Sequence, residues 1–278
     1  MKKILNQLVQ LQELDFVLAE NKASSAKIPL DQLEKSIIQI QQQLPEEIGA
    51  RYKRLHGRFP LAVVPMMRGT CPPCGIALPP AVVNAVKAAD QVQTCPHCGR
   101  FLYLPEAVAR QPRKPMSNDR PAAAGIAKFS APALMVPKLA ATTREEAIQE
   151  LSVVMQTNGF IEDSATLAGL ALRREAMIST AVEHGLAFPH ARDVEGGGLT
   201  FAVGLKEKGL DFGASDEKLT KIIFLIAIPT PASAFYLRLL AGMVRAFSET
   251  AARKSLLECD TPEAMWKTLT KLTRETIP

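Results

Sequence analysis

Apolar residues recur at helical spacing over the first quarter of the chain. In residues 1–22 they stand four or three positions apart, with Asp15 interrupting the series: Ile4, Leu8, Leu11 and Leu18. This spacing predicts an amphipathic helix that can pair in a coiled coil. Helical spacing resumes over residues 30–56, where Pro45 marks a break or a restart. We expect a short helical hairpin or coiled coil over residues 1–60, and a plain hairpin without a partner fits the same pattern.

The pattern changes to alternating helical and strand-like segments after residue 133. Thr143 and Glu146 have the spacing of a capping box, which predicts a helix over residues 143–155. The other predicted helices are residues 164–174, 232–247 and 262–272, the last with Thr261 as its N-cap. Strand-like runs cover residues 187–188, 199–205 and 221–228, and the last is apolar throughout and therefore expected to be buried. These elements predict an α/β domain over residues 132–278.

Residues 108–131 separate the two patterns. They are rich in proline, alanine and charge, and they have no apolar periodicity, which predicts a semi-extended linker. A chain of 278 residues is expected to form two or three modules. We divide it into residues 1–60 (helical), 61–107 (the cysteine-containing segment described below), 108–131 (linker) and 132–278 (α/β).

Hydropathy indicates no membrane insertion. No apolar run approaches the ~20 residues that a bilayer span requires. The first fifteen residues carry two lysines but no apolar core free of polar residues, unlike a secretory signal. A cytoplasmic protein is therefore expected.

Charge is divided unevenly along the chain. Residues 1–128 hold 17 Lys and Arg against 10 Asp and Glu, a net of +7, whereas residues 129–278 have a net of −2. The basic half could attract nucleic acid or an acidic protein. Because nucleic-acid footprints normally cluster and no dense arginine stripe is present, a solvated surface is the favoured interpretation.

Four cysteines form two matched CxxCG turns separated by twenty residues: Cys71, Cys74, Cys95 and Cys98. In a cytoplasmic chain, two such turns predict one tetrahedral Zn²⁺ site, because each supplies two thiolates and its glycine permits the tight bend. Four thiolates leave no position for water, so the zinc would be structural. Disulfides and redox chemistry are the less favoured alternatives.

The surroundings of these cysteines resemble a known family. The matching stretches are residues 44–45, 52–55, 62–65, 69–71, 78–80 and 95–103 (CPHCGRFLY). In this order they are similar to the bacterial coiled-coil family that ends in a C4-type zinc ribbon. The resemblance covers residues 1 to about 107, although the helical arms here are shorter than is usual in that family. It implies a small β zinc ribbon and a scaffold or adaptor that binds an unknown protein partner through helices and ribbon.

Residues 174–192 (REAMISTAVEHGLAFPHAR) carry the second candidate site. Arg174 stands sixteen positions before His190, which closes a short apolar run. A neutral imidazole is a competent nucleophile near neutral pH, and a bidentate arginine can compensate the charge on a transferred phosphoryl group. Arg174 also continues the apolar face of its predicted helix, where it could simply extend its charged end into solvent.

The same segment resembles the enzyme IIA component of the bacterial sugar phosphotransferase system, mannitol/fructose/nitrogen class. The motif elements are residues 174–175, 179–180, 185–187 and 189–192, and the resemblance extends from about residue 134 to 275. It implies a mixed sheet flanked by helices. It further implies that His190 accepts a phosphoryl group from the general phosphocarrier protein, forming phosphohistidine, while Arg174 neutralises the phosphate. An ordinary histidine at a strand end is the alternative for His190.

Two further residues are possible supports for the site. His184 lies in a predicted loop, where it could hydrogen-bond the phosphate or could be an exposed loop residue. Many members of the family have a His-Leu pair at the start of the penultimate helix, and the matching pair here is Tyr236-Leu237. A tyrosine hydroxyl can donate one hydrogen bond, but it carries no positive charge.

Two functions follow from these patterns. In the first, the chain is a phosphocarrier that passes the group on or signals its state, and the adaptor-like first half favours regulation over sugar transport. In the second, the chain is a non-catalytic zinc-ribbon scaffold for a protein or nucleic-acid partner, and its enzyme IIA-like domain is a sensory module.

Overall fold

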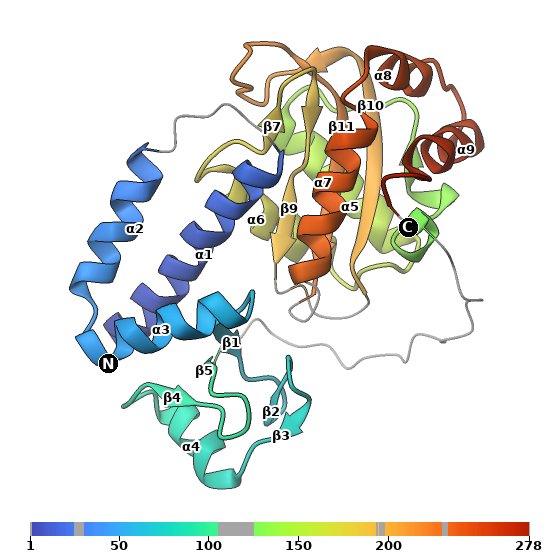
Figure 1. The fold of residues 1–278 in the computed structure, drawn as a ribbon. Helices are drawn as coiled ribbons and strands as arrows, with labels where there is room; N and C mark the ends of the chain where they lie inside the picture. The colour runs from blue at the N-terminus through green and yellow to red at the C-terminus, as the bar shows by residue number, and fades with distance from the viewer. Residues whose placement is uncertain are drawn as a thin grey trace. The chain divides into compact units, whose positions relative to one another are not determined.

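The structure is a computed structural model that describes residues 2–24, 31–104, 125–192, 194, 198–229 and 233–277. The chain divides into two compact units. The first comprises residues 1–20 and 29–115, and the second comprises residues 21–28 and 116–278. Figure 1 shows the elements of both units.

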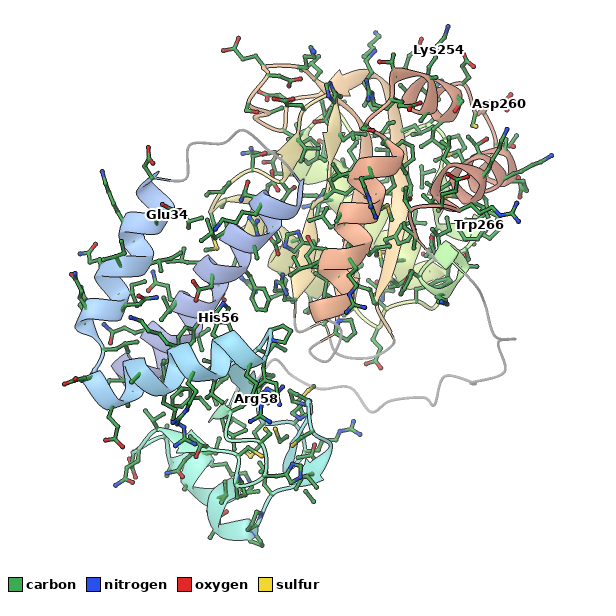
Figure 2. The ribbon with its side chains drawn as sticks, viewed as in Figure 1. Glu34, His56, Arg58, Lys254, Asp260 and Trp266 are labelled. Carbon is green, nitrogen blue, oxygen red and sulfur yellow. The ribbon has the colours of Figure 1, made fainter. Side chains whose placement is uncertain are left out.

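Three helices form the first part of the chain: α1 Lys2–Ser24, α2 Asp31–Gln43 and α3 Glu46–Arg58. The predicted break at Pro45 is confirmed, because Pro45 is the N-cap of α3. Proline has no N–H to donate and its φ is fixed near the value that a helix start requires, so it ends one helix and begins the next. Asp15, which interrupts the apolar series of α1, accepts a 2.7 Å hydrogen bond from the buried hydroxyl of Tyr52 on α3. Tyr52 in turn stacks on His56, one turn further along α3; His56 is labelled in Figure 2.

The cysteine-containing segment adds five short strands and one helix: β1 Val63–Pro65, β2 Thr70–Cys71, β3 Ile76–Ala77, α4 Pro80–Ala88, β4 Gln93–Thr94 and β5 Phe101–Tyr103. Strands β1, β5 and β4 form one sheet, and β2 with β3 forms a hairpin. Helix α4 lies between the two cysteine pairs along the chain and was not predicted from the sequence.

Buried polar side chains join the helices of this unit to its strands. Gln12 of α1 accepts hydrogen bonds from the backbone N–H groups of Ala62 and Val63 at 2.8 and 2.7 Å, and donates to the Val63 carbonyl at 2.8 Å. Among the described strands β1 pairs with β5 alone, so the Gln12 amide satisfies backbone groups that a further strand would otherwise bind. Arg51 of α3 donates to the Gly99 carbonyl at 3.1 Å. Helices and strands therefore form one hydrogen-bonded body.

The second unit is built around a six-stranded sheet. Its strands are β6 Met135–Val136, β7 Ala181–Val182, β8 Leu186–Ala187, β9 His190–Arg192, β10 Thr200–Leu210 and β11 Thr220–Ile228. The order is β6-β10-β11-β8-β7, with β9 also paired to β11. Strands β10 and β11 are antiparallel, whereas β6 is parallel to β10, and β8 and β9 are parallel to β11. The sheet is thus mixed, as the resemblance implied.

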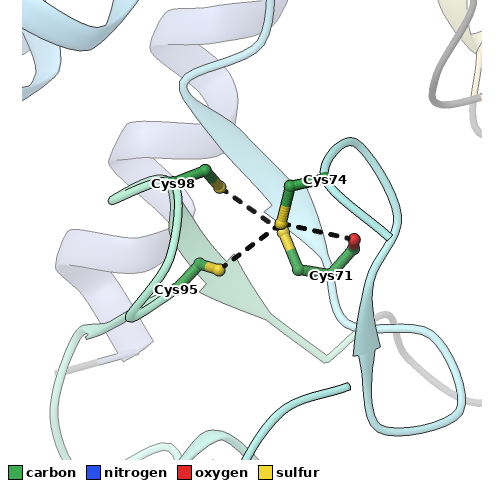
Figure 3. A group of neighbouring side chains, drawn as sticks. All are labelled: Cys71, Cys74, Cys95 and Cys98. Carbon is green, nitrogen blue, oxygen red and sulfur yellow. Dashed lines mark hydrogen bonds between the residues drawn. The ribbon is translucent and has the colours of Figure 1, made fainter. Parts of the chain in front are cut away.

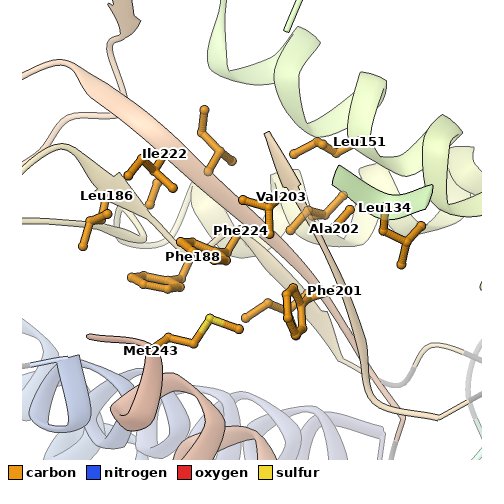
Figure 4. Close-up of a cluster of buried hydrophobic side chains, with 14 of the residues drawn as sticks. Leu134, Leu151, Leu186, Phe188, Phe201, Ala202, Val203, Ile222, Phe224 and Met243 are labelled. Carbon is orange, nitrogen blue, oxygen red and sulfur yellow. The ribbon is translucent and has the colours of Figure 1, made fainter. Parts of the chain in front are cut away.

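Helices cover this sheet. They are α5 Arg144–Thr157, α6 Ser164–Glu175, α7 Ser233–Ala246, α8 Thr250–Leu257 and α9 Pro262–Thr273, preceded by the 3₁₀ turns η1 Gly125–Lys128 and η2 Pro132–Leu134. Leu151 of α5 and Met243 of α7 approach the sheet from opposite faces (Figure 4). Between them, the rings of Phe188 and Phe224 stack with centroids 5.0 Å apart. The core is therefore two layers of apolar side chains, one on each face of the sheet.

Two expectations from the sequence were wrong. The predicted linker included residues 125–131, but Ile126 is buried in the core and Ser130 Oγ donates to the Phe201 carbonyl at 2.8 Å, so this stretch is part of the domain. Residues 108–124 of the predicted linker lie outside the described residues. Helix α8 was not predicted, so Tyr236 lies in the third helix from the end, not in the penultimate one. In the capping box of α5, Thr143 accepts from the Glu146 N–H as expected, and the Glu146 carboxylate accepts from the N–H and hydroxyl groups of Thr142.

Candidate functional site

Four cysteine side chains converge at one point of the first unit (Figure 3). Cys71 ends β2 and Cys74 follows it, while Cys95 and Cys98 lie in the turn between β4 and β5. Their sulfur atoms all lie within 4.8 Å of one another. Two pairs, Cys71 with Cys98 and Cys74 with Cys95, are each separated by 3.7 Å.

These distances fit a tetrahedral metal ion. Zinc bound to thiolates at about 2.3 Å holds its four sulfurs about 3.8 Å apart. A disulfide needs a sulfur–sulfur distance of about 2.05 Å, and all four cysteines are free thiols. Burial raises the pKa of the Cys71 thiol. Burial also tends to raise the pKa of Cys98, but hydrogen bonds from Arg100 outweigh this effect and lower that pKa to about 7. Four sulfurs fill the coordination shell, so the site suits a structural ion.

The glycine of each CxxCG turn makes the cluster possible. Gly75 and Gly99 have φ of +70° and +76°, in the left-handed region that favours glycine. This bend allows the Gly75 N–H to donate to the Cys71 carbonyl at 2.9 Å, and the Gly99 N–H to donate to the Cys95 carbonyl at 2.9 Å. His97, inside the second turn, is exposed and does not join the cluster.

His190 is the first residue of β9, which pairs with β11 in the mixed sheet. Its backbone pairs with Ile226 of β11, while Leu186, four residues earlier, pairs with Ile222. The segment 186–192 is therefore extended and runs alongside β11. Only 1% of the His190 side chain is exposed.

Hydrogen bonding determines the tautomer of His190. Its Nδ1 lies 3.0 Å from the carbonyl oxygen of Phe188. A carbonyl can only accept, so Nδ1 must carry the proton and donate it. The lone pair of the neutral imidazole is then on Nε2, which makes Nε2 the nucleophilic nitrogen.

Tyr236 lies against this imidazole. Its hydroxyl oxygen is 3.1 Å from His190 Nδ1, and the two rings are 5.0 Å apart with an interplanar angle of 39°. The Arg192 guanidinium lies over the Tyr236 ring, 5.1 Å from its centroid. The structure thus brings the predicted pair His190 and Tyr236 together and adds Arg192, a residue of the sequence motif to which no role was assigned.

Arg174 lies in the last turn of α6, which packs against β9. It is half-buried, whereas Arg173 is exposed, and its Nη1 donates to the Ile178 carbonyl at 2.9 Å. The arginine is therefore anchored on the helix that faces the histidine strand.

The motif residues after Arg174 position the histidine. The buried Glu175 carboxylate accepts a 3.1 Å bond from the Thr180 N–H and a 2.5 Å bond from the Thr180 hydroxyl. The Thr180 carbonyl accepts from the Phe188 N–H at 3.1 Å, and the Phe188 carbonyl accepts from His190. A chain of hydrogen bonds thus runs from α6 to the imidazole. The sequence showed Glu175 and Thr180 only as members of a motif, and did not reveal this chain.

His184 is not brought to the site. It lies, exposed, in the turn between β7 and β8 with φ +76°, and its N–H donates to Asp216 at 3.1 Å. This turn precedes Leu186, the first residue of the 186–192 segment. Four residues of extended strand separate Leu186 from His190 and span about 13 Å. The geometry favours the exposed-loop interpretation.

Two family models match this chain. The model of the family described as phosphoenolpyruvate-dependent sugar phosphotransferase system, EIIA 2, matches residues 129–272, which is more than half of the chain. The chain belongs to this family. Its second unit is an EIIA domain, a phosphoryl-transfer carrier component of the phosphotransferase system. The model described as C4-type zinc ribbon domain matches residues 70–102, which contain all four clustered cysteines.

Individual relatives match the EIIA domain. The fructose-specific EIIA component of the phosphotransferase system from Haloferax volcanii is 28% identical over 130 residues, 47% of this chain and 84% of the relative. The nitrogen regulatory protein from Bradyrhizobium diazoefficiens is 25% identical over 145 residues, 52% of this chain and 94% of the relative. The crystal structure of nitrogen regulatory protein IIA-Ntr from Neisseria meningitidis covers 52% of this chain and 99% of its own, with 23% identity and a TM-score of 0.48. Among the described helices, none combines the length and apolar character that crossing a bilayer requires.

Proposed function

We propose that the EIIA domain of this chain is a regulatory phosphocarrier whose His190 accepts a phosphoryl group from the general phosphocarrier protein. The domain then passes the group on, or signals its phosphorylation state to a protein bound by the helices and the zinc ribbon. The observation that carries this proposal is the 3.0 Å hydrogen bond between His190 Nδ1 and the Phe188 carbonyl, which leaves the lone pair on Nε2.

The transfer step follows from this tautomer. A bond forms between Nε2 and phosphorus while the phosphorus–nitrogen bond of the donor's phosphohistidine breaks. Nδ1 keeps its proton, so the His190 ring gains positive charge as the new bond forms. The Phe188 carbonyl accepts this proton's hydrogen bond and stabilises the charge. No general base is required.

Arg174 is proposed to compensate the negative charge of the phosphoryl oxygens. Phosphoryl transfer depends mainly on positioning and on charge compensation, and a guanidinium offers several donors in one plane. Arg174 lies on α6, which packs against β9, and its bond to the Ile178 carbonyl just after that helix supports this role.

The first unit is proposed to bind one structural Zn²⁺ through its four cysteines and to contact a partner protein. Free thiols at metal-binding distances suit a reducing compartment, so we propose a cytoplasmic location. The joining of a zinc ribbon to an EIIA domain supports regulation more than sugar transport.

The second candidate function is a scaffold whose EIIA domain senses without transferring a phosphoryl group. Two observations favour it: His190 is only 1% exposed, and Tyr236 stands where many family members have a histidine. In this function the partner, a protein or a nucleic acid, would bind the zinc-ribbon unit.

A phosphorylation assay separates the two functions. The zinc-loaded full chain is incubated with phosphoenolpyruvate, enzyme I and the general phosphocarrier protein, and acid-labile phosphate is measured. We expect one phosphate per chain, lost in His190→Ala and kept in His184→Ala, because His184 is exposed at the far end of the segment. An unlabelled wild type, alongside a labelled control acceptor, would exclude the carrier function.

A further inference from the structure

Arg192 and His190 lie on the same face of β9. They are two residues apart in a strand, and side chains at i and i+2 point to the same side of a sheet. Ala191, between them, is buried on the other face. Strand β9 therefore presents the Arg192 guanidinium and the proposed phosphoryl acceptor, His190, on one face.

The Tyr236 ring contacts both of these side chains. Its centroid is 5.0 Å from that of the His190 ring and 5.1 Å from the central carbon of the Arg192 guanidinium. Tyr236 is completely buried, so the ring is fixed by packing. A cation over a fixed aromatic face is held by the ring's quadrupole, and the N–H groups at the edge of a guanidinium can still donate to an anion.

The charge of the site calls for such a cation. A phosphoryl group on His190 brings close to two negative charges, and Tyr236 cannot supply a positive charge. Arg192 can supply it, since an arginine stays protonated at every physiological pH.

We infer that Arg192 is a second phosphate-binding residue of the EIIA site and that Tyr236 is the positioning residue that holds it beside His190. This inference rests on the proposed phosphorylation of His190. Arg192 binds the oxygens of the phosphoryl group after transfer, and Tyr236 keeps the guanidinium within reach of them. Arg192 thereby supplies the positive charge that Tyr236 cannot provide.

The test measures the phosphoryl-exchange equilibrium between the general phosphocarrier protein and the zinc-loaded full chain. A lost charge-assisted hydrogen bond to a phosphate is expected to shift this equilibrium roughly 10-fold toward the donor in Arg192→Gln. Arg192→Lys keeps the charge and should recover part of the shift. Arg245→Gln, which removes an exposed arginine from the end of α7, should leave the equilibrium unchanged.

Variants of Tyr236 test the positioning role separately. Tyr236→Phe keeps the aromatic face and should keep the contribution of Arg192, so that adding Arg192→Gln to it still shifts the equilibrium about 10-fold. Tyr236→Leu removes the face, so adding Arg192→Gln to it should have little further effect. Thermal unfolding of every variant shows whether the domain is folded.

The outcomes separate this inference from the proposed function. If the wild type accepts phosphate and folded Arg192→Gln reaches the same equilibrium, the inference is wrong and the phosphocarrier function stands. The inference is also wrong if Arg192→Lys is no better than Arg192→Gln. If the wild type takes no phosphate from active donors, both are excluded.

Discussion

The hydroxyl oxygen of Tyr236 and the carbonyl oxygen of Phe188 are both within hydrogen-bond distance of His190 Nδ1, at 3.1 and 3.0 Å. The carbonyl can only accept, so the Nδ1 proton points toward these two oxygens. The Tyr236 oxygen then acts as a second acceptor for the same N–H group. The hydroxyl therefore supports the tautomer with its lone pair on Nε2, so a tyrosine at this position is compatible with Nε2 as the proposed nucleophile.

Tyr236→Phe is expected to leave the His190 tautomer unchanged. The Phe188 carbonyl remains as an acceptor, so Nδ1 stays protonated, which ¹⁵N chemical shifts of the ring would show. Because one buried hydrogen bond is lost, the free energy of unfolding should fall by about 1 kcal/mol. Trp266, the only tryptophan of the chain, lies in α9 and reports this unfolding by fluorescence (Figure 2). A proton on Nε2 in the variant would show that Tyr236 sets the tautomer.

The residue types of this site could be predicted from the sequence, but its arrangement could not. His190 and Arg174 stand in a motif that is readable without coordinates. The roles of Phe188 and Thr180 depend on backbone carbonyl and N–H groups, which every residue has and no side-chain pattern reveals. His184 is only six residues from His190, and the extended segment between them carries it away from the site.

Removing one cysteine of the cluster should remove both the metal and the fold of the ribbon. Thiolate ligands supply folding free energy through the ion that they bind. Cys71→Ser should therefore abolish binding of about one Zn²⁺ per chain, as measured by elemental analysis of dialysed protein. Circular dichroism should show a loss of ordered structure, while the Trp266 fluorescence of the EIIA domain is retained.

Cys259→Ser is the matched control for this loss. Cys259 lies just after α8, where its thiol contacts the Ser255 carbonyl and the Thr268 hydroxyl at 3.4 Å each. It should keep the full zinc content. Equal metal content in Cys71→Ser and Cys259→Ser would contradict the four-cysteine site.

Asp163 should stabilise α6, the helix that carries Arg174, through its N-cap. Its Oδ2 accepts a hydrogen bond from the Thr166 hydroxyl, and its Oδ1 accepts from the N–H groups of Thr166 and Ala165. These bonds, that of the hydroxyl most of all, hold the pKa of Asp163 below its ordinary value. Asp163→Ala is expected to lower the free energy of unfolding by about 1 kcal/mol at pH 7. Urea titrations followed through Trp266 would measure the difference.

The contribution of Asp163 should depend on pH in one direction. A carboxyl with a lower pKa in the folded state contributes fully above its unfolded pKa of about 3.9. That contribution is lost as the pH falls through the lower folded value. The difference between wild type and Asp163→Ala should therefore shrink below about pH 4. Asp163→Asn keeps an acceptor that does not titrate, so its difference from Asp163→Ala should stay constant.

Regular periodicity allowed most helices and the two long strands to be predicted. The short strands and the polar contacts between elements have no such period, and they could not be predicted. The continuous apolar run of β11 predicts a buried strand, and the structure buries all but one of its residues. The strands β6, β7 and β9 are two or three residues long, too short for any period to show. In α1, Asp15 interrupts the apolar series and Gln12 was not singled out from the sequence, although Gln12 binds β1 and Asp15 binds α3.

Gln12→Leu should therefore destabilise the first unit although it makes α1 more apolar. The change leaves the buried N–H groups of Ala62 and Val63 without the acceptor that Gln12 supplies, and the Val63 carbonyl without its donor. At 1–3 kcal/mol for each buried unsatisfied group, a loss of about 3 kcal/mol or more is expected. Amide hydrogen exchange at Ala62 and Val63 should accelerate accordingly. Gln7→Leu, which removes only an exposed contact with Gln43, should change the stability by no more than about 0.5 kcal/mol. Equal effects of the two substitutions would mean that the amide of Gln12 does not hold β1 in place.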